Sequence, residues 1–150
     1  MNASADNHVV KELEGLLQSF FHAVSFEAAQ TPSYAIEGLF IDAGLLIRNS
    51  GTTPEVSDVR GFIKPRRASV AAGELVRFHE AEIHAVTQVF GNVAHRFSAY
   101  TKSGTLNGTP FQARGMISSQ FVLTPDGWRI SCMAWDDERP GLPLSSAYVA

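Results

Sequence analysis

Two charged residues flank a short apolar run in the N-terminal half of the chain and are the first candidates for chemistry. The stretch FIDAGLLIRNSG, residues 40–51, has Asp42 near its start and Arg48 near its end. A carboxylate held beside a carbon acid can act as a general base, whereas arginine stays protonated at neutral pH and cannot. Its planar fork of donors suits a carboxylate or an enolate instead. We expect Asp42 to be a corner or capping residue, and Arg48 to be either an ordinary strand-end charge or a ligand-binding residue.

Histidine, cysteine and acidic side chains elsewhere give weaker signals. His79, His84 and His95 come from neighbouring segments, but their spacing matches no metal-ligand motif, so we predict no metal site and no cofactor. Cys132 lies in an apolar run, where a free cysteine behaves as a small hydrophobe. The acidic residues 136–138 follow one another at the end of a predicted strand. Consecutive strand residues point to opposite faces, so we expect a solvated strand end and not an acid–base pair.

The elements that must position these residues differ between the two halves of the chain. Residues 7–29 carry apolar side chains at helical spacing, which predicts a long amphipathic helix. Residues 31–39 begin with Thr-Pro, a typical start for a short second helix, and a short strand is expected over 44–47. The Ser-Asp pair at 57–58 is an N-cap signal for a third helix, which Pro65 is expected to kink or interrupt.

The second half of the chain has the composition and the turns of an antiparallel sheet. Its segments are rich in Val, Ile, Phe, Thr and Trp, and pairs of turn residues (Gly-Asn, Asn-Gly and Asp-Gly) lie between them. The predicted strands are 81–90, 93–102, 111–124 and 127–137. Helices followed by a run of strands predict an α+β protein, with the helices packed on one face of the sheet.

The alternation of side chains assigns the last two strands to faces. A two-residue Asp-Gly turn places Trp128, Ile130 and Cys132 on the same inner side as Phe121. The outer side then carries Arg129, Met133 and Trp135. An outer sheet face with such side chains is a candidate protein–protein surface, so we predict that these three residues form a dimer interface.

The direction of His84 stays open. A two-residue Gly-Asn turn after this strand places His84 on the face of Phe97, whereas a bulge would place Ile83 there.

The composition argues against several classes of function. Twelve Lys and Arg residues against fifteen Asp and Glu give a net charge of −3, which argues against nucleic acid or an anionic membrane as the partner. No apolar run approaches the ~20 residues of a membrane span, and the N-terminus has no signal-peptide pattern. We expect a cytoplasmic protein in which residues 1–150 form a single domain.

Three stretches resemble the nuclear transport factor 2-like superfamily. They are VFGNVAHRFSAY (89–100), ARGMISSQFVLTPDGWRISCMAWDDE (113–138) and PGLPLSSAY (140–148). The resemblance implies a cone-shaped, cystatin-like fold, in which a curved antiparallel sheet wraps around three N-terminal helices and leaves a pocket at the wide end. Members include ketosteroid isomerases and polyketide cyclases, and many form homodimers through the outer face of the sheet. Membership of a fold does not choose among these functions.

The resemblance also implies positions in the pocket for the candidate residues. In the isomerase-like members a carboxylate ends the strand after the second helix, but here Arg48 or a neighbour falls at that position, so no catalytic residue is identified. The ligand-binding candidates are Tyr34, Arg48, His84, Tyr100 and Arg114. One hypothesis is a protein that binds a small hydrophobic molecule, with isomerase-, cyclase- or dehydratase-type activity left open. The alternative is a non-catalytic dimeric interaction module whose own phenylalanines fill the cone.

Overall fold

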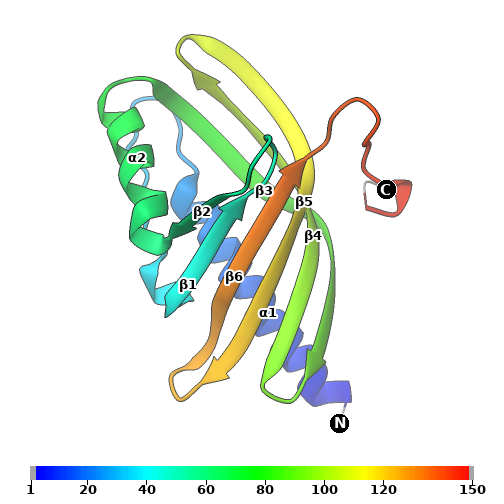
Figure 1. The fold of residues 1–150 in the computed structure, drawn as a ribbon. Coiled ribbons are helices and arrows are strands. Elements are labelled where there is room, and N and C mark those ends of the chain that lie inside the picture. Colours follow the sequence, from blue (N-terminus) through cyan, green and yellow to red (C-terminus); the bar gives the residue numbers. More distant parts are fainter. Residues whose placement is uncertain (1–2, 149–150) are drawn as a thin grey trace.

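The computed structural model describes residues 3–148, which form an α+β fold (Figure 1). The helices are α1 (Ala3–Val24) and α2 (Val59–Ala71). The strands are β1 (Phe40–Arg48), β2 (Glu55–Asp58), β3 (Leu75–Phe90), β4 (Val93–Leu106), β5 (Thr109–Thr124) and β6 (Gly127–Asp137). They form one sheet in the order β2-β1-β6-β5-β4-β3. None of the helices in this range is long and apolar enough to cross a membrane.

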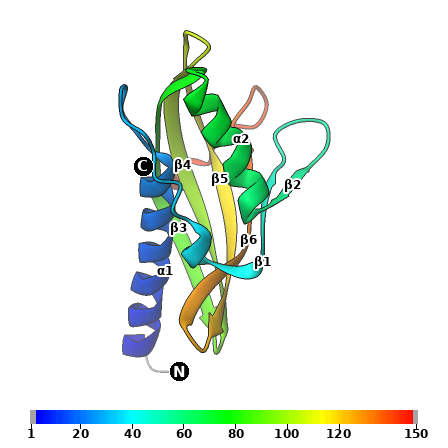
Figure 2. The ribbon, with the colours of Figure 1, turned by 90° about the vertical axis from the view of Figure 1, so that its left-hand side faces the viewer.

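The sheet is curved, and the helices cover its inner face (Figure 2). Helix α1 runs along the sheet, while α2 lies beside the half at which β1 and β2 are added. All neighbouring strands are antiparallel except β1 and β6, which are parallel. The α+β prediction is confirmed. The sheet is mixed, however, because the N-terminal strand β1 pairs in parallel with the C-terminal strand β6, a long-range contact that no local turn signal predicts.

Helix α1 is held by an apolar stripe against the sheet. Leu13, Leu17, Phe20 and Phe21 are all buried there. Fully burying such side chains stabilises a fold by about 1.5–3 kcal/mol each. The helix ends at Val24 and not near residue 29, because the backbone of the next segment pairs with β3: the N–H of Phe26 donates to the carbonyl oxygen of Phe78 at 2.8 Å.

The predicted helix over residues 31–39 is wrong. Only Glu37–Leu39 form a short 3-10 turn, so the described chain has two α-helices where three were predicted. The cause is the backbone of Tyr34, which has a positive φ of 48° and donates its N–H to the carbonyl oxygen of Ala23 at 3.0 Å. A left-handed residue cannot continue a right-handed helix.

Helix α2 begins where predicted and runs through Pro65 to Ala71. The side chain of Asp58 accepts a hydrogen bond from the N–H of Gly61 at 2.7 Å, which is the expected N-cap. Of the two expected effects of Pro65, a kink or an interruption, the interruption does not occur. Its missing N–H removes one backbone hydrogen bond, which the packing of Phe62 and Ile63 in the core offsets.

Two bulges decide which side chains face the core. In β3 the register shifts between Glu82 and His84, so His84 pairs with Ala99 on the outer face while Glu82 faces inward. In β6 the register shifts between Ile130 and Cys132, which leaves Ser131 as the extra residue. An extra residue reverses the alternation beyond it.

The bulge in β6 overturns part of the predicted dimer interface. Met133 is fully buried in the core, and Trp135 is partly buried and packs against Phe62 with ring centroids 6.0 Å apart. The prediction that Met133 and Trp135 lie on the outer face is therefore wrong. Arg129 precedes the bulge and keeps the predicted orientation, pointing away from its buried neighbours Trp128 and Ile130.

Candidate functional site

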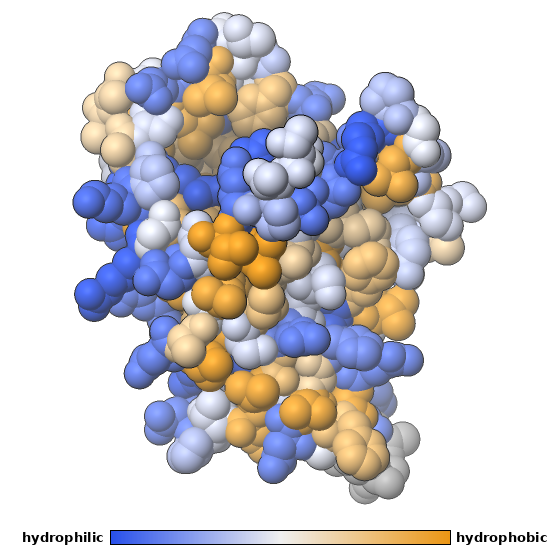
Figure 3. All heavy atoms as spheres, viewed as in Figure 1, coloured by the Kyte–Doolittle hydropathy of each residue, from blue (hydrophilic) through white to orange (hydrophobic). Residues whose placement is uncertain are grey.

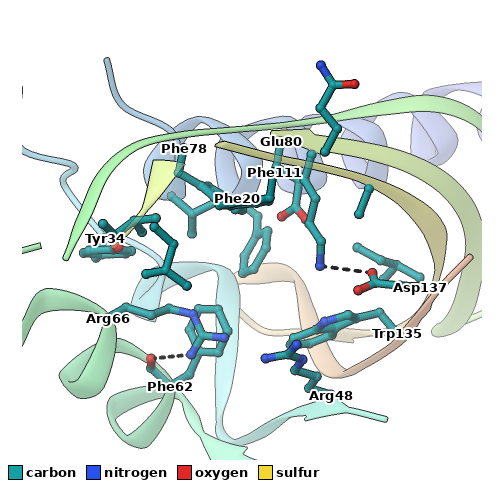
Figure 4. Close-up of a pocket in the computed structure, with 17 residues that line it drawn as sticks. Phe20, Tyr34, Arg48, Phe62, Arg66, Phe78, Glu80, Phe111, Trp135 and Asp137 are labelled. Atoms are coloured by element: carbon teal, nitrogen blue, oxygen red, sulfur yellow. Dashed lines mark hydrogen bonds and ion pairs between the residues drawn. The ribbon is translucent and has the colours of Figure 1, made fainter. Parts of the chain in front are cut away.

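A cavity of about 390 Å³ lies between α2, the end of α1 and the inner face of the sheet (Figure 4). Much of its wall is aromatic: Phe20, Phe62, Phe78, Phe111 and Trp135. Its polar groups are Tyr34, Arg48, Arg66, Glu80, Gln112, Lys102 and Asp137. An apolar cavity with a few convergent polar groups is typical of a small-molecule site.

Glu80 is the carboxylate best placed for proton transfer. It lies on β3, its N–H donates to the Ser25 hydroxyl at 3.1 Å, and its side chain points into the cavity (Figure 4). No donor within residues 3–148 hydrogen-bonds its carboxyl group, and no ion pair includes it. Burial raises the pKa of Glu80 to about 7, against the opposing effect of Lys102 and Arg66. The group can therefore gain or lose a proton near neutral pH.

Lys102 does not neutralise Glu80, because it already has a partner. Lys102 faces Glu80 across β3 and β4, but its Nζ lies 3.0 Å from Oδ1 of Asp137 on β6. The hydroxyl of Tyr100 also donates to the Asp137 carboxylate. Burial, together with this hydrogen bond, raises the pKa of Tyr100, so its hydroxyl stays protonated. Asp137 thus accepts from two donors, and Glu80 is left without an ion-pair partner among residues 3–148.

The position of Gly115 allows the Tyr100 contact. Gly115 pairs with Tyr100 across β4 and β5, and a Cβ added to it would collide with the Tyr100 hydroxyl and with the carbonyl oxygen of Asp136. Glycine is therefore required for the close approach that fixes Tyr100 against Asp137.

Tyr34 provides a neutral donor at the opposite side of the cavity from Asp137 (Figure 4). It is buried, with a left-handed backbone that is uncommon for a bulky residue. Burial raises the pKa of Tyr34, with Arg66 and Arg67 opposing that shift, so the hydroxyl is protonated at neutral pH. Strained backbone of this kind is concentrated at functional sites, where it positions a side chain.

Two arginines flank an aromatic pair on a third side. The guanidinium of Arg66 lies 3.5 Å from the centroid of the Phe62 ring, and its Nη1 donates to the Phe62 carbonyl oxygen at 3.0 Å. Arg48 ends β1, lies beside Trp135 of β6, and donates from Nε to the Ser50 hydroxyl at 3.0 Å. Both line the cavity (Figure 4).

The five predicted ligand-binding residues lie in different places. Tyr34 and Arg48 line the cavity, while Tyr100 is fully buried beside it, bonded to Asp137. His84 is on the outer face, with its ring centroid 5.4 Å from that of Tyr148: it shares the face of Phe97, as the two-residue Gly-Asn turn predicts, because the register is unbroken from that turn back to His84. Arg114 is exposed on the outer face and pairs with Glu138 at 3.1 Å. His84 and Arg114 therefore do not reach this cavity.

Sequence reasoning missed four charged residues of the cavity. Glu80 precedes the predicted strand 81–90, although β3 in fact begins at Leu75, so it was given no face. Arg66 and Lys102 were assigned no role, although both line the cavity. Asp137 was taken as solvated, although alternation did separate it from Asp136, which pairs with Arg139 at 2.6 Å. Within residues 3–148, no group of three His, Cys, Asp or Glu side chains could hold a metal ion.

Comparison with known proteins finds similarity at the level of structure. No protein-family model and no curated protein matches the sequence. An NTF2-like superfamily protein from Salmonella enterica serovar Typhimurium aligns with a TM-score of 0.72 and 14% identity over 94% of this chain and 95% of that one. An NTF2-like protein with a cystatin-like fold from Novosphingobium aromaticivorans aligns with a TM-score of 0.66 and 18% identity, over 99% and 93% of the two chains. A candidate dehydratase of the NTF2-like family from Streptomyces avermitilis aligns with a TM-score of 0.67 and 12% identity over 89% of this chain and 99% of that one.

Proposed function

We propose that this chain, which has the nuclear transport factor 2-like fold, binds a small and largely hydrophobic molecule in the cavity and transfers a proton on it through Glu80. The observation that carries the proposal is the Glu80 carboxyl group: it faces an aromatic cavity, has no hydrogen-bond or ion-pair partner among the described residues, and has a pKa of about 7. An ionised carboxyl group in such a setting costs stability, and carboxyl groups with pKa values raised in this way are concentrated at functional sites.

The surrounding groups suit proton transfer next to a carbonyl. The ionised Glu80 would take a hydrogen as a proton from the carbon beside the carbonyl; the C–H electron pair would form the C=C bond of an enolate, and the C=O π pair would move to the carbonyl oxygen. The protonated hydroxyl of Tyr34 lines the same cavity and can donate to that oxygen. Return of the proton to another carbon gives isomerisation, whereas loss of hydroxide from the neighbouring carbon gives dehydration.

Hydrogen exchange in a simple ketone tests this proposal. The probe is 2-tetralone in D2O, and proton NMR follows the replacement of its α-hydrogens by deuterium. Wild-type protein is expected to accelerate the exchange above the buffer rate, and Glu80→Gln to reduce that acceleration by at least about 100-fold. Glu37→Gln is the matched control, because the Glu37 side chain is exposed and lies outside the cavity lining. Equal rates for wild-type protein and Glu80→Gln would contradict the proposed role of Glu80.

A second proposal concerns the outer face of the sheet, where we propose that two copies of the chain pair. Exposed apolar side chains collect near the β3–β4 turn, toward the lower end of the sheet in Figure 3: Val86, Phe90, Val93 and Phe97. Phe90 is 84% exposed. Val86 faces Phe97, and Phe90 faces Val93, so the four form one patch on β3 and β4. Burying this patch against a second copy would remove it from water.

A further inference from the structure

The charged groups of the cavity do not cancel one another. Arg48, Arg66 and Lys102 are cations, whereas Glu80 and Asp137 are the carboxylates. Lys102 and Asp137 form an ion pair. Glu80 has a pKa of about 7 and is therefore only partly ionised at neutral pH. The cavity consequently carries an excess of positive charge, contributed by the two arginines.

The two arginines lack carboxylate partners and keep free donors. In the part of the chain that the structure describes, no ion pair includes Arg48 or Arg66. Each guanidinium has five N–H donors, and each uses one of them in a hydrogen bond, Arg66 to the Phe62 carbonyl and Arg48 to the Ser50 hydroxyl. The remaining donors are available to a ligand.

The two guanidinium groups approach the cavity from either side of one aromatic pair. Arg66 stacks on Phe62, Phe62 meets Trp135 edge to face, and Trp135 lies beside Arg48 on the neighbouring strand. Figure 4 shows both guanidinium groups on the side of the cavity opposite Glu80. Burial lowers the pKa of Arg66; Tyr34, Glu80 and Glu55 oppose that shift, and the positive charge of Arg48 adds to it. An anion between the two groups would relieve this repulsion.

We infer that the ligand is an apolar molecule with one anionic group, of the monocarboxylate class, whose carboxylate is held between Arg48 and Arg66. The aromatic wall then takes its apolar body, and the body extends from the arginines toward Glu80. This inference rests on the proposed function, since it takes the cavity as the binding site, and it adds the charge of the ligand. Bidentate hydrogen bonds from guanidinium to carboxylate give such a site both affinity and orientation.

Paired ligands that differ in one charge test the inference. The probes are 2-naphthoate and its neutral methyl ester, titrated by calorimetry at pH 7.5 and low salt. Wild-type protein is expected to bind 2-naphthoate about 10-fold more tightly than the ester, the size expected for hydrogen bonds to a charged group. Arg48→Gln should abolish that preference while leaving the affinity for the ester within about 2-fold.

Two further variants complete the test. Arg66→Gln should also remove the preference for the acid, and its thermal unfolding shows whether loss of the stacking on Phe62 has altered the fold. Arg48 lies at an exposed strand end, so Arg48→Gln remains decisive in either case. Arg60→Gln is the control, because Arg60 lies on the same helix as Arg66 with a side chain that is 87% exposed. It should bind both probes as wild-type protein does.

The outcomes separate the two proposals. Equal affinity of wild-type protein for acid and ester, or an Arg48→Gln variant that still prefers the acid, overturns the anionic ligand and leaves the cavity as a binding site. Failure of wild-type protein to bind either probe overturns binding in the cavity, and the inference with it.

Discussion

Replacing Glu80 by glutamine should raise the free energy of unfolding relative to wild type at alkaline pH, and the gain should be much smaller at acid pH. The pKa of Glu80 is raised from its ordinary value of 4.5 to about 7 because burial disfavours the charged form. Between these two pH values the folded protein holds a proton that the unfolded chain has released. The free energy of unfolding of the wild-type protein therefore falls as pH rises through this range, and the loss is complete above pH 7.

The size of the effect follows from the shift. A shift of this size corresponds to about 3 kcal/mol at pH 8, since one pKa unit is worth about 1.4 kcal/mol. At pH 5 most of that penalty is absent, so the stability difference between Glu80→Gln and wild type should grow by about 2–3 kcal/mol from pH 5 to pH 8. A buried amide has a cost of its own, but that cost is independent of pH and cancels in this comparison. For a chain of this length the change corresponds to roughly 4–12 °C in melting temperature.

Urea unfolding followed by circular dichroism at pH 5 and pH 8 measures this difference directly. The control is Glu55→Gln, whose difference from wild type should not change with pH in this way, because Glu55 is exposed on β2. A difference between Glu80→Gln and wild type that is the same at both pH values would refute the raised pKa. It would also remove the main argument for proton transfer at this residue.

Two further substitutions test the support of the cavity and the outer face. Gly115→Ala should destabilise the fold by about 1–3 kcal/mol, because the new methyl group collides with the Tyr100 hydroxyl and with the carbonyl oxygen of Asp136. Thermal unfolding measures the loss, and an unchanged melting temperature would contradict the close approach of Gly115 to Tyr100. We expect wild-type protein to sediment as the proposed dimer in sedimentation velocity and Phe97→Glu to sediment as a monomer, since the substitution places a charge in the proposed apolar interface. A wild-type monomer, or a Phe97→Glu variant with the same dimeric sedimentation coefficient as wild type, would contradict this interface.

The sequence predicted the sheet more accurately than the site. The turns at Gly91-Asn92 and Asp126-Gly127 and the period-two segments around them correspond to β3 to β6, because these signals are local. The helix predicted over 31–39 failed because the left-handed backbone at Tyr34 is fixed by a hydrogen bond to Ala23, outside the segment itself. The parallel pairing of β1 with β6 is likewise a long-range contact.

The site was harder to predict because single inserted residues control it. The extra residue Ser131 moves Met133 into the core and Trp135 to the cavity, and the shift near Ile83 turns Glu82 and Glu80 to the inner face. Nothing in the composition of either strand marks these bulges. A sequence pattern with period two therefore assigns faces correctly only up to the first bulge.

The strongest reason to look for function in this cavity is that the fold has no need of Glu80. Lys102 already pairs with Asp137, and the Tyr100 hydroxyl donates to the same carboxylate, so Lys102 and Asp137 have partners without Glu80. An apolar residue facing the same aromatic wall would fill the space without the penalty of about 3 kcal/mol that ionised Glu80 imposes. At the opposite side, burial of the Arg66 guanidinium imposes a second penalty of the same kind. Both are relieved at once by a ligand that presents an anion to the arginines and a transferable hydrogen to Glu80.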